Sequence, residues 1–370
     1  MVLEKLELKN FRLHKSTKIN FSNKLNYIVG GNGQGKTTIL EAIYYLCTTK
    51  NLNNNSDSEV ISFDQDFFEI EGSFKNLVDN KVRINLLREN SRKQTFLDDK
   101  QINRAASFIG KFPVVTLTQS DHSLTLGSPS GRRKFVDSVI SQSSVTYLKI
   151  ILDYNKTLRQ RSYLLTKIKE TGDKSLLDQL EAWDELLIKN GVQIIDHRKH
   201  FVAEFNEYVK ESYENLLNGK EYPEIFYSFH EEEKEEVTED LLRRLLAEKR
   251  KVELVRCVNL VGPHRDDFIF KINNIDLKKY GSQGQHKTFQ IALKFGQFFF
   301  MKDKLENEPV FLMDDVFGEL DGYRAGKTSD FLRSVGQAFI TLTDFTKYSD
   351  LVNKESDFVM EVNHGSVSYV

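Results

Sequence analysis

One short stretch constrains this chain more than any other. It is a glycine-rich segment with the spacing of a phosphate-binding loop, Gly30-Gly31-Asn32-Gly33-Gln34-Gly35-Lys36-Thr37-Thr38. Glycines let the backbone fold into a tight concave turn in which successive N–H groups face an anion. Residues 25–29 before the loop predict a buried strand, and residues 38–46 after it predict a helix whose N-terminus also favours an anion. The segment therefore predicts binding of a nucleoside triphosphate.

Two side chains of this loop have predicted roles in that binding. Lys36 would supply a positive charge to the β- and γ-phosphates, and the Thr37 hydroxyl would ligate Mg²⁺. A glycine-rich surface turn without a ligand is the plain alternative. The strand before the loop and the helix after it disfavour that alternative.

Composition limits the remaining possibilities. A chain of 370 residues with 39% hydrophobic content is expected to bury a substantial core, arranged as two domains or lobes. Its formal net charge of -2 means that any nucleic-acid binding must come from a local basic face. The two cysteines, Cys47 and Cys257, are too far apart in sequence to predict a metal site or a disulfide framework. No apolar run is long enough to span a membrane and no secretory pattern opens the chain, so we expect a cytoplasmic protein with no membrane partner.

A pair of acids follows an apolar strand late in the chain. Residues 310–313 predict a buried strand that ends in Asp314-Asp315, followed by the turn Glu319-Leu320-Asp321. An acid at the end of such a strand is the expected second contact of Mg²⁺ in a P-loop ATPase, so Thr37 and Asp314 are the predicted metal ligands. Asp315 is then placed to polarise the attacking water.

A serine, Ser282, precedes a long predicted helix. The run Ser282-Gln283-Gly284-Gln285 would expose a hydroxyl and several backbone N–H groups at the helix N-terminus. An ordinary helix cap explains this run equally well when it is taken alone. Its position just before the strand that ends in Asp314 favours a contact with nucleotide.

Two further side chains are candidates for the nucleotide site. Gln119 follows a predicted strand at residues 114–117, where ATPases of the ABC type place a glutamine that senses the γ-phosphate and Mg²⁺. Arg12 follows a strand near the N-terminus and would lie near the nucleotide, although an exposed arginine is the commoner explanation.

The middle of the chain predicts a helical arm. No proline occurs between Pro129 and Pro223, and apolar residues recur at heptad-like intervals, interrupted by Arg161. A turn at residues 171–175 divides the pattern, so we expect two antiparallel helices that reach on the order of 40 Å. His197, His200 and Glu204 would share one helical face, for which solvent exposure is a better explanation than a metal.

Two basic segments are candidates for contacts with a phosphate backbone. Both are also explained by ordinary solvent exposure. The candidate residues are Arg132, Arg133 and Lys134 in the first segment and Arg243, Arg244, Lys249, Arg250 and Lys251 in the second.

Together these motifs resemble the ABC-type ATPase head. That resemblance implies an α/β fold, a mixed sheet with flanking helices, into which a short antiparallel helical arm domain is inserted. We expect residues 1–130 to form the N-terminal part of the ATPase, residues 131–255 the arm, and residues 256–370 the signature helix and the C-terminal ATPase part. In this class Ser282 of one subunit completes the nucleotide site of another, so ATP binding drives dimerisation. The long insertion indicates the branch that serves chromosome maintenance and DNA repair.

Within that branch the chain resembles the RecF family of bacterial recombination mediators, over nearly its whole length. The shared motifs, in the family's order, are Asn10-Phe11-Arg12, Gly33-Gln34-Gly35-Lys36-Thr37, Gly127-Ser128-Pro129 with Arg132-Arg133, Gly262-Pro263-His264-Arg265-Asp266-Asp267, Gly281-Ser282-Gln283-Gly284-Gln285, and Asp314-Asp315-Val316-Phe317 with Glu319-Leu320-Asp321.

The resemblance implies an ATP- and Mg²⁺-dependent DNA-binding protein that acts at single-strand gaps and their junctions with duplex. It implies RecO and RecR as partners, and RecA loading onto strands coated by single-strand-binding protein. Hydrolysis would be slow and DNA-stimulated, and the protein would be nucleoid-associated. A transporter ATPase, an SMC-like DNA tether and an overcoming-lysogenisation-type nuclease are the alternatives. The long insertion, the short arm and the early end of the chain, respectively, disfavour them.

Overall fold

The computed structural model describes residues 1–52, 56–89, 92–217, 219, 221–229, 237–320, 322–344, 352–353 and 355–370. For residues 105 and 319 it describes the backbone alone. Asp321 of the predicted Leu-Asp turn lies outside the described residues.

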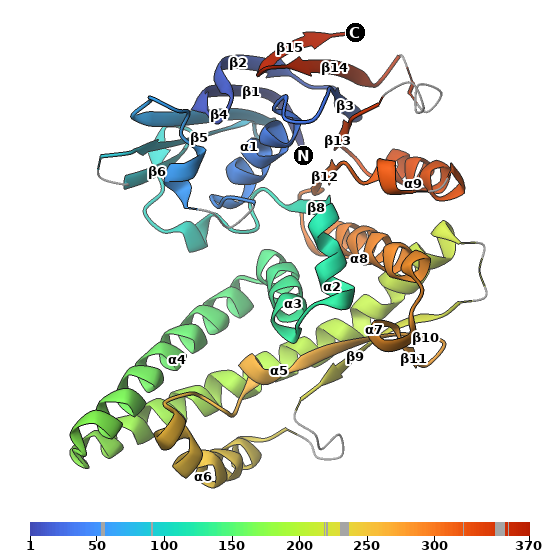
Figure 1. Cartoon of the computed structure of the whole chain (residues 1–370). Helices are drawn as coiled ribbons and strands as arrows, with labels where there is room; N and C mark the ends of the chain where they lie inside the picture. Colours follow the sequence, from blue (N-terminus) through green and yellow to red (C-terminus); the bar gives the residue numbers. More distant parts are fainter. Residues whose placement is uncertain are drawn as a thin grey trace. The chain divides into compact units, whose positions relative to one another are not determined.

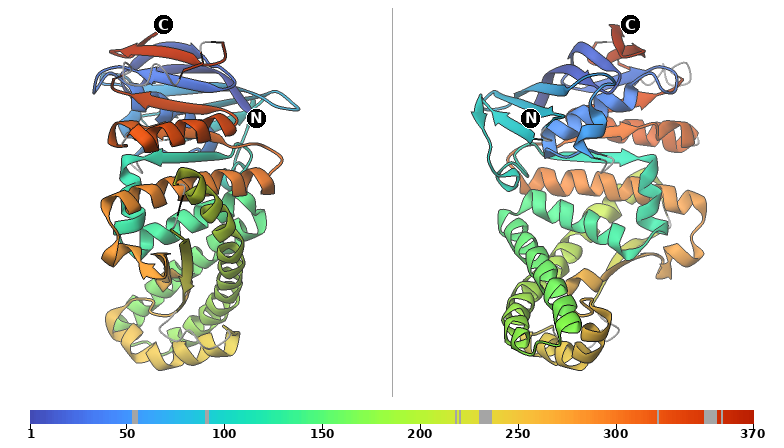
Figure 2. Two further views of the ribbon diagram at one scale, coloured as in Figure 1. Left: turned by 90° about the vertical axis from the view of Figure 1, so that its right-hand side faces the viewer. Right: turned by 60° about the vertical axis from the view of Figure 1, so that its left-hand side comes forward.

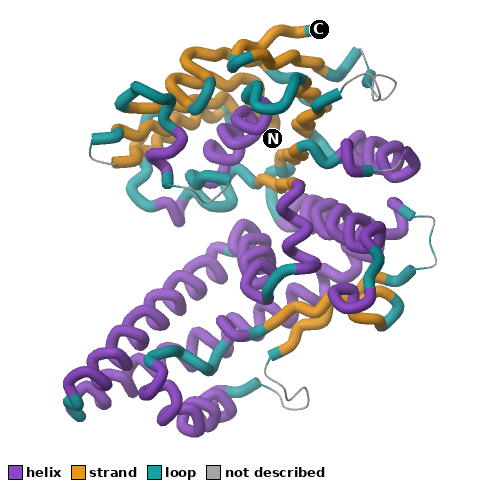
Figure 3. Tube along the Cα trace, in the orientation of Figure 1, coloured by secondary structure: helices purple, strands orange, loops and turns teal. Residues whose placement is uncertain are grey.

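Contacts between residues divide the chain into two compact units. The first unit comprises Met1–Asp121, Glu211–Gly219 and Ile291–Val370, and the second comprises His122–Lys210 and Lys220–Gln290. Figure 3 shows that strands are concentrated in the first unit and helices in the second. The three-part division predicted from the sequence rests on the positions of motifs, whereas these two units rest on contacts between residues. The three-part division therefore stays a prediction.

A mainly parallel sheet organises the first unit. Its strand order is β15-β14-β3-β13-β12-β8, and only the pairing of β14 with β15 is antiparallel. The strands are β3 (Leu25–Val29), β8 (Val114–Thr118), β12 (Val310–Asp314), β13 (Ala338–Leu342), β14 (Phe358–Asn363) and β15 (Ser366–Tyr369). All five residues of β13 are buried, as expected for a parallel strand covered on both faces. Because parallel strands end at one edge, the loops after β3, β8, β12 and β13 converge there.

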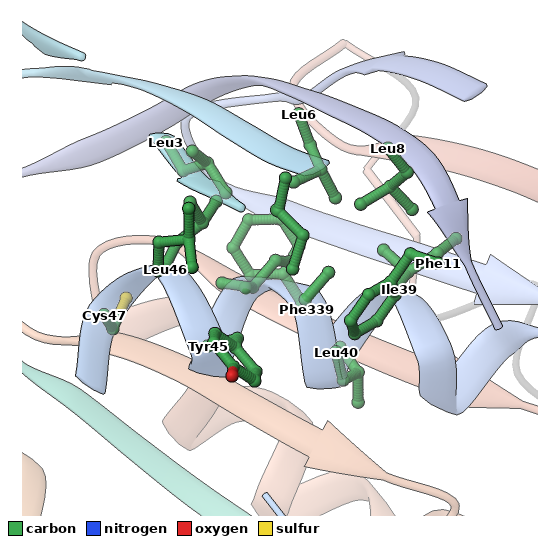
Figure 4. Packing of buried hydrophobic residues seen from close by; sticks show 14 of the residues in the cluster. Leu3, Leu6, Leu8, Phe11, Ile39, Leu40, Tyr45, Leu46, Cys47 and Phe339 are labelled. Carbon is green, nitrogen blue, oxygen red and sulfur yellow. The ribbon is translucent and has the colours of Figure 1, made fainter. Parts of the chain in front are cut away.

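A second, antiparallel sheet packs over helix α1 (Lys36–Thr48). Its strand order is β2-β1-β4-β5-β6-β7. The strands are β1 (Val2–Phe11), β2 (His14–Asn20), β4 (Phe67–Lys75), β5 (Asn80–Leu87), β6 (Arg92–Leu97) and β7 (Lys100–Gln101). Apolar residues alternate along β1, so that Leu6 and Leu8 face Ile39 and Leu40 of α1 in one buried core (Figure 4). This core holds the helix that leaves the predicted phosphate loop.

The second unit is built mainly from helices, and it contains the predicted arm. Helix α4 (Val145–Thr171) is capped by Gly172 and α5 (Ser175–Leu216) begins three residues after this cap, so the turn lies where the sequence predicts it. Figures 1 and 2 show the two helices meeting at this turn as an antiparallel pair, with α6 close to their outer ends. The other elements are α2 (His122–Leu126), α3 (Pro129–Ser143), α6 (Glu239–Arg256), α7 (Leu277–Tyr280), and the sheet formed by β9 (Pro223–Ser228), β10 (Asp267–Ile272) and β11 (Ile275–Asp276).

Two helices remain, α8 (Gln283–Lys304) and α9 (Gly322–Ser334). In the part of the chain that the structure describes, no helix is long and apolar enough to cross a membrane. Among the same residues, no group of three or more His, Cys, Asp or Glu side chains is placed to hold a metal ion.

Candidate nucleotide site

A cleft of about 620 Å³ lies in the first unit, over the N-terminal end of α1. Residues of the phosphate loop line it together with the two acids that follow β12, Asp314 and Asp315. Its volume falls within the range of small-molecule and cofactor sites. The cleft thus joins two motifs that are far apart in the sequence.

The loop has the backbone that its glycines predict. Gly35 has a φ of +108°, a left-handed conformation that residues with side chains rarely adopt. A Cβ atom at Gly30 would lie 2.4 Å from the carbonyl oxygen of Val362, so β14 permits only glycine there. These two positions fix the curvature of the loop between β3 and α1.

Lys36 lies against its own loop. Its Nζ donates hydrogen bonds to the carbonyl oxygens of Gly30 (2.7 Å) and Gly31 (2.9 Å). Burial lowers the pKa of Lys36, and the nearby carboxylates of Asp315 and Asp314 oppose that shift. The ammonium group is therefore held at the loop by neutral acceptors, which anionic phosphate oxygens would replace with stronger ones.

Asp314 is the centre of a small hydrogen-bond network at the edge of the sheet. Its Oδ1 accepts hydrogen bonds from the hydroxyls of Thr37 (3.0 Å) and Thr341 (2.7 Å). The strand register explains this, because Asp314 of β12 pairs with Thr341 of β13 on one side and Thr118 of β8 on the other. The Thr37 hydroxyl and the Asp314 carboxylate are hard oxygen donors that meet at the phosphate loop, a donor set that suits Mg²⁺.

Asp315 and Gln119 are joined through the backbone. The Gln119 Nε2 donates to the carbonyl oxygen of Asp315 at 3.3 Å, and the Asp315 N–H donates to the Thr341 hydroxyl at 2.9 Å. Asp315 has a φ of +49°, in the left-handed region that Asp tolerates better than most residues. The segment after β12 is therefore held from both neighbouring strands while Asp315 lines the cleft.

Arg12 forms part of the cleft wall. Its Nε and Nη2 bind the two carboxylate oxygens of Glu41, which is buried in α1, at 2.5 and 2.9 Å. A bidentate pair of this kind fixes the plane of the guanidinium group. Arg12 thus lines the cleft with its orientation set by the helix that follows the phosphate loop, and its contact with a nucleotide stays a prediction.

Sequence reasoning missed several residues that support the loop. The His14 Nε2 lies 3.2 Å from the Gly35 carbonyl oxygen, and burial lowers the pKa of His14. The turn between β14 and β15 holds Gln34, because the His364 N–H donates to its Oε1 (2.8 Å) and the Gly365 N–H to its carbonyl (3.0 Å). In the sequence, only the polar residues at the end of the buried strand that contains Thr341 could have indicated that this strand supports the cleft.

Ser282 lies at the start of α8, in the second unit. The Ser282 N–H donates to the Gln285 Oε1 at 2.9 Å, and the Gln285 N–H donates to the Ser282 Oγ at 3.2 Å. This reciprocal pair is a capping box, and it leaves Ser282 and Gln283 exposed beside the half-buried Gly284. Its role in a partner's nucleotide site stays a prediction.

The first basic segment is not uniformly exposed, which corrects one expectation. Arg132 is only 4% exposed, and its Nε and Nη2 bind both carboxylate oxygens of Asp267 at 2.8 and 2.9 Å. A buried arginine with a bidentate partner is a structural residue, so Arg132 is not available to a DNA phosphate. Arg133 donates to the Asp266 carbonyl oxygen, and Lys134 is exposed.

The second basic segment lies on α6 and is mostly exposed. Arg243 pairs with Glu185 and Asp240, and Arg250 pairs with Asp184. Arg244, Lys249 and Lys251 are exposed on the same helix. The exposed pairs of Arg243 exchange readily for other anions, since each is worth little in water, whereas the partner of Arg250, Asp184, is buried.

The fold and the cleft define an ABC-type P-loop ATPase, and comparisons with known proteins agree. The family model described as "AAA domain" matches residues 5–255. Over 359 residues the chain is 37% identical to the DNA replication and repair protein RecF of Chloroherpeton thalassium, covering 95% of this chain and 97% of that protein. It is 34% identical to the RecF of Salinibacter ruber, covering 96% of this chain and 88% of that one.

A solved structure of the recombination mediator protein RecF with ATP matches with a TM-score of 0.89 at 30% identity, covering 100% of this chain and 97% of that one. The chain belongs to the RecF family.

Proposed function

We propose that this chain is an ATP-dependent recombination mediator of DNA replication and repair. The observation that carries the proposal is the meeting of Thr37, Asp314 and Thr341 beside Lys36 in the cleft. ATP would lie with its triphosphate over residues 30–38, and Thr37 and Asp314 would hold Mg²⁺. Bound Mg²⁺ supplies positive charge to the β- and γ-phosphate oxygens.

In this proposal the protein's own groups organise hydrolysis. Asp315 lines the cleft and orients water, and Gln119 reports on the γ-phosphate through its hydrogen bond to the Asp315 backbone. Lys36 balances the charge of the phosphates, and Arg12 adds a second fixed cation at the wall. Hydrolysis is slow and DNA-stimulated, and it serves as a switch that resets the protein.

We further propose that ATP drives formation of a homodimer. The segment Ser282-Gln283-Gly284-Gln285 at the start of α8, with its first two residues exposed and its last two half-buried, would contact the γ-phosphate held by the partner subunit. The exposed capping box supports this proposal, because its hydroxyl and the N-terminal N–H groups of a long helix suit an anion. Each subunit then contributes half of each site.

The dimer would clamp DNA at single-strand gaps and their junctions with duplex. Lys134, with Arg133 beside it, and the α6 residues Arg243, Arg244, Lys249, Arg250 and Lys251 are the proposed phosphate contacts. The solved RecF–ATP structure is assigned to the RecFOR pathway, which supports RecO and RecR as partners here. RecA loading onto strands coated by single-strand-binding protein is the proposed outcome, in the cytoplasm at the nucleoid.

Light scattering with and without ATP tests the composite site. We expect wild-type protein to dimerise with ATP and Ser282→Arg to stay monomeric while it still binds ATP, because the larger side chain blocks the partner's γ-phosphate. Thr166→Arg, an exposed substitution on α4 in the same unit, is the matched control and should dimerise normally. Normal dimerisation of Ser282→Arg would contradict the shared site.

ATP hydrolysis measured with gapped DNA, duplex DNA and no DNA tests the DNA proposal. We expect stimulation by DNA, most of all by gapped DNA, and binding that weakens steeply with salt because phosphate contacts release counterions. Hydrolysis that is indifferent to DNA would reopen the transporter and tether alternatives.

A further inference from the structure

A buried histidine, His14, lies directly behind the phosphate loop. Gly35 of the loop lines the cleft, and the fully buried His14 contacts Gly35 from the protein interior. A Cβ atom at Gly35 would lie 3.0 Å from the His14 Nε2, so the ring packs against the loop at the glycine that caps α1. The ring therefore supports the part of the loop on which a triphosphate would lie.

Three hydrogen bonds run from the loop through His14 to the turn between β14 and β15. The His14 Nε2 lies 3.2 Å from the Gly35 carbonyl oxygen, and its Nδ1 lies 3.1 Å from the Thr17 Oγ1. The Thr17 hydroxyl donates in turn to the Gly365 carbonyl oxygen at 3.0 Å. Both side chains are buried, so their polar atoms depend on these partners for hydrogen bonds.

The three bonds can all form only when His14 carries two ring protons. A carbonyl oxygen only accepts, so the His14 Nε2 must donate to Gly35, and Thr17 must use its single hydroxyl proton to bond Gly365. In a neutral ring Nδ1 then has no proton, and two lone pairs face each other across 3.1 Å. An imidazolium ring donates from both nitrogens and satisfies all three bonds at once. The geometry of the chain thus favours the charged ring.

The surroundings of the ring oppose this charge in the free protein. Burial lowers the pKa of His14, and the carbonyl oxygens of Gly35 and Gly365 oppose the shift. Charged side chains flank the ring on each surrounding element, namely Lys15 on β2, Lys9 on β1, Arg12 between these strands, Lys36 and Glu41 on α1, and His364 in the β14–β15 turn.

These flanking charges differ in how they would respond to a ligand. Lys9 and Arg12 are each paired with a glutamate, and Lys15 and His364 are exposed. Lys36 instead lies against carbonyl oxygens of the loop and lines the cleft. A bound triphosphate would offset the positive charge of Lys36 and add further negative charge beside the loop, so it would favour a cation behind the loop.

We propose that His14 is a positioning residue that takes up a proton when the triphosphate binds, so that an imidazolium then supports the phosphate loop from the interior. The inference rests on the proposed function, which places the triphosphate over residues 30–38. In the free protein the ring is neutral at pH 7, and the bound phosphates raise its affinity for a proton. By linkage, the affinity for nucleotide then rises as pH falls through the range at and below the ordinary pKa of histidine, about 6.5.

Calorimetric titration of the full chain with a non-hydrolysable ATP analogue and Mg²⁺, at about pH 7.5 and about pH 5.5, tests the proposal. Two buffers with different heats of ionisation count the protons taken up, and the protein is kept dilute enough to be monomeric by light scattering. We expect wild type to take up roughly 0.2–0.5 proton more per nucleotide than His14→Gln at the lower pH. We also expect its affinity to rise about three- to tenfold more between the two pH values.

His14→Gln is the informative variant, because its amide N–H can still donate to the Gly35 carbonyl oxygen but the side chain cannot titrate. Protonation of the nucleotide itself, and of Asp266 in the second unit, is common to both proteins and cancels in the difference. A second variant, Thr17→Val, leaves the ring in place and removes the acceptor for Nδ1–H, so it should reduce the proton uptake.

His364→Asn is the matched control and should keep the wild-type pH dependence. It removes the exposed histidine of the β14–β15 turn, and asparagine tolerates the left-handed φ of +46° at this position. The same pH dependence in wild type and His14→Gln would overturn the inference, even if the variant bound more weakly at both pH values, because His14 would then be a neutral support.

Two other results would also overturn it. One is loss of the pH dependence in His364→Asn, which would assign the proton to the exposed histidine. The other is full proton uptake in Thr17→Val, which would show that the chain of hydrogen bonds does not hold the proton. Failure of the wild-type chain to bind the analogue at either pH would instead overturn the proposed function itself.

Discussion

The two units use the same charged residue types in opposite ways. In the nucleotide cleft, Lys36 is bound to backbone carbonyls and the Asp314 carboxylate to hydroxyls, all of them neutral partners. In the second unit, Arg161 is fully buried between the carboxylates of Asp184 and Glu253, at 2.7 and 2.9 Å. Lys36 and Asp314 have no oppositely charged partner in these hydrogen bonds, so each can still bind a charged ligand strongly, whereas Arg161 is already neutralised by two carboxylates.

A second buried cluster repeats the pattern at the Gly-Pro-His-Arg-Asp-Asp string. Arg198 is buried between Asp137 and Asp266, and Asp267 of the same string holds Arg132. Gly262 begins the string because a Cβ there would lie 2.3 Å from the Tyr154 hydroxyl. The Gly-Pro-His-Arg-Asp-Asp string is thus, in its observed contacts, part of the scaffold that joins the helices of the second unit.

Replacing one aspartate by asparagine in each unit tests this difference between buried charges and cleft charges most directly. We expect Asp184→Asn to lower the free energy of unfolding by about 3–5 kcal/mol, because it leaves Arg161 and Arg250 with one carboxylate between them in a buried site. We expect Asp314→Asn to change stability by less than about 1 kcal/mol, since the amide oxygen still accepts from Thr37 and Thr341. Denaturant unfolding measures both.

For the rate of ATP hydrolysis we expect the reverse order, with a large effect of Asp314→Asn and none of Asp184→Asn. Asp314→Asn removes a charge from the proposed Mg²⁺ site, so we expect the rate of ATP hydrolysis to fall about 100-fold or more. Asp184→Asn should retain wild-type turnover at a temperature where it is folded. Arg243→Ala, which breaks an exposed pair with Glu185, is the control for charge removal alone, and we expect it to change neither the stability nor the rate of hydrolysis measured without DNA. A stability loss in Asp314→Asn equal to that in Asp184→Asn would remove the distinction between the units.

This comparison also explains how far the sequence could be used for prediction. Local spacing predicted the phosphate loop, the strand that ends at Asp314, the cap at Ser282 and the turn between α4 and α5, because each depends on neighbours in the chain. The ABC-type fold class is confirmed by the solved relatives and the observed sheets. The buried state of Arg132 and Arg161 was not predictable, since their carboxylate partners come from other elements.

The supports of the cleft were missed for a similar reason. Thr341 reaches Asp314 only through the pairing of β13 with β12, and the β14–β15 turn reaches Gln34 only because β14 pairs with β3. Thr341 is 27 residues from Asp314 and His364 is 330 residues from Gln34, so no local pattern of neighbouring residues encodes either contact. In the sequence Arg161 interrupts an apolar stripe, but in the structure it is the centre of a buried ion network.

The stability of the second unit should also depend on pH, because it contains the buried histidine His264. His264 is neutral there, because Nδ1 accepts from the Tyr154 hydroxyl (2.8 Å) while Nε2–H donates to the Asn259 carbonyl (3.1 Å). Burial, aided by the charges of Arg265, Arg133 and Arg161, lowers the pKa of His264 to about 4. The unfolded state therefore takes up the proton first, and the stability is complete above about pH 6.5 and lost as pH falls towards 4.

We expect this loss to reach up to about 3 kcal/mol, measured as the free energy of unfolding at pH 7 and pH 4. His264→Gln cannot titrate in this range, so it should lose less stability over the same interval. Burial raises the pKa of Asp266 to about 6, which acts in the opposite direction but is common to both proteins. Parallel loss of stability in the two proteins would show that His264 does not titrate as described.

The smallest expected effect concerns Gln34, which helps to position the phosphate loop but carries no charge. Gln34→Ala removes the hydrogen bond from the His364 N–H, which ties the phosphate loop to the β14–β15 turn. One such bond contributes about 0.5–1.5 kcal/mol, so we expect KM for ATP to rise about two- to tenfold. We expect kcat to stay nearly unchanged, because no charge at the reacting phosphate is altered. Gln101→Ala, an exposed change on β7, should alter neither constant. A fall in kcat at constant KM would mean instead that Gln34 acts in the transition state, so that even a neutral support of the loop takes part in the chemistry.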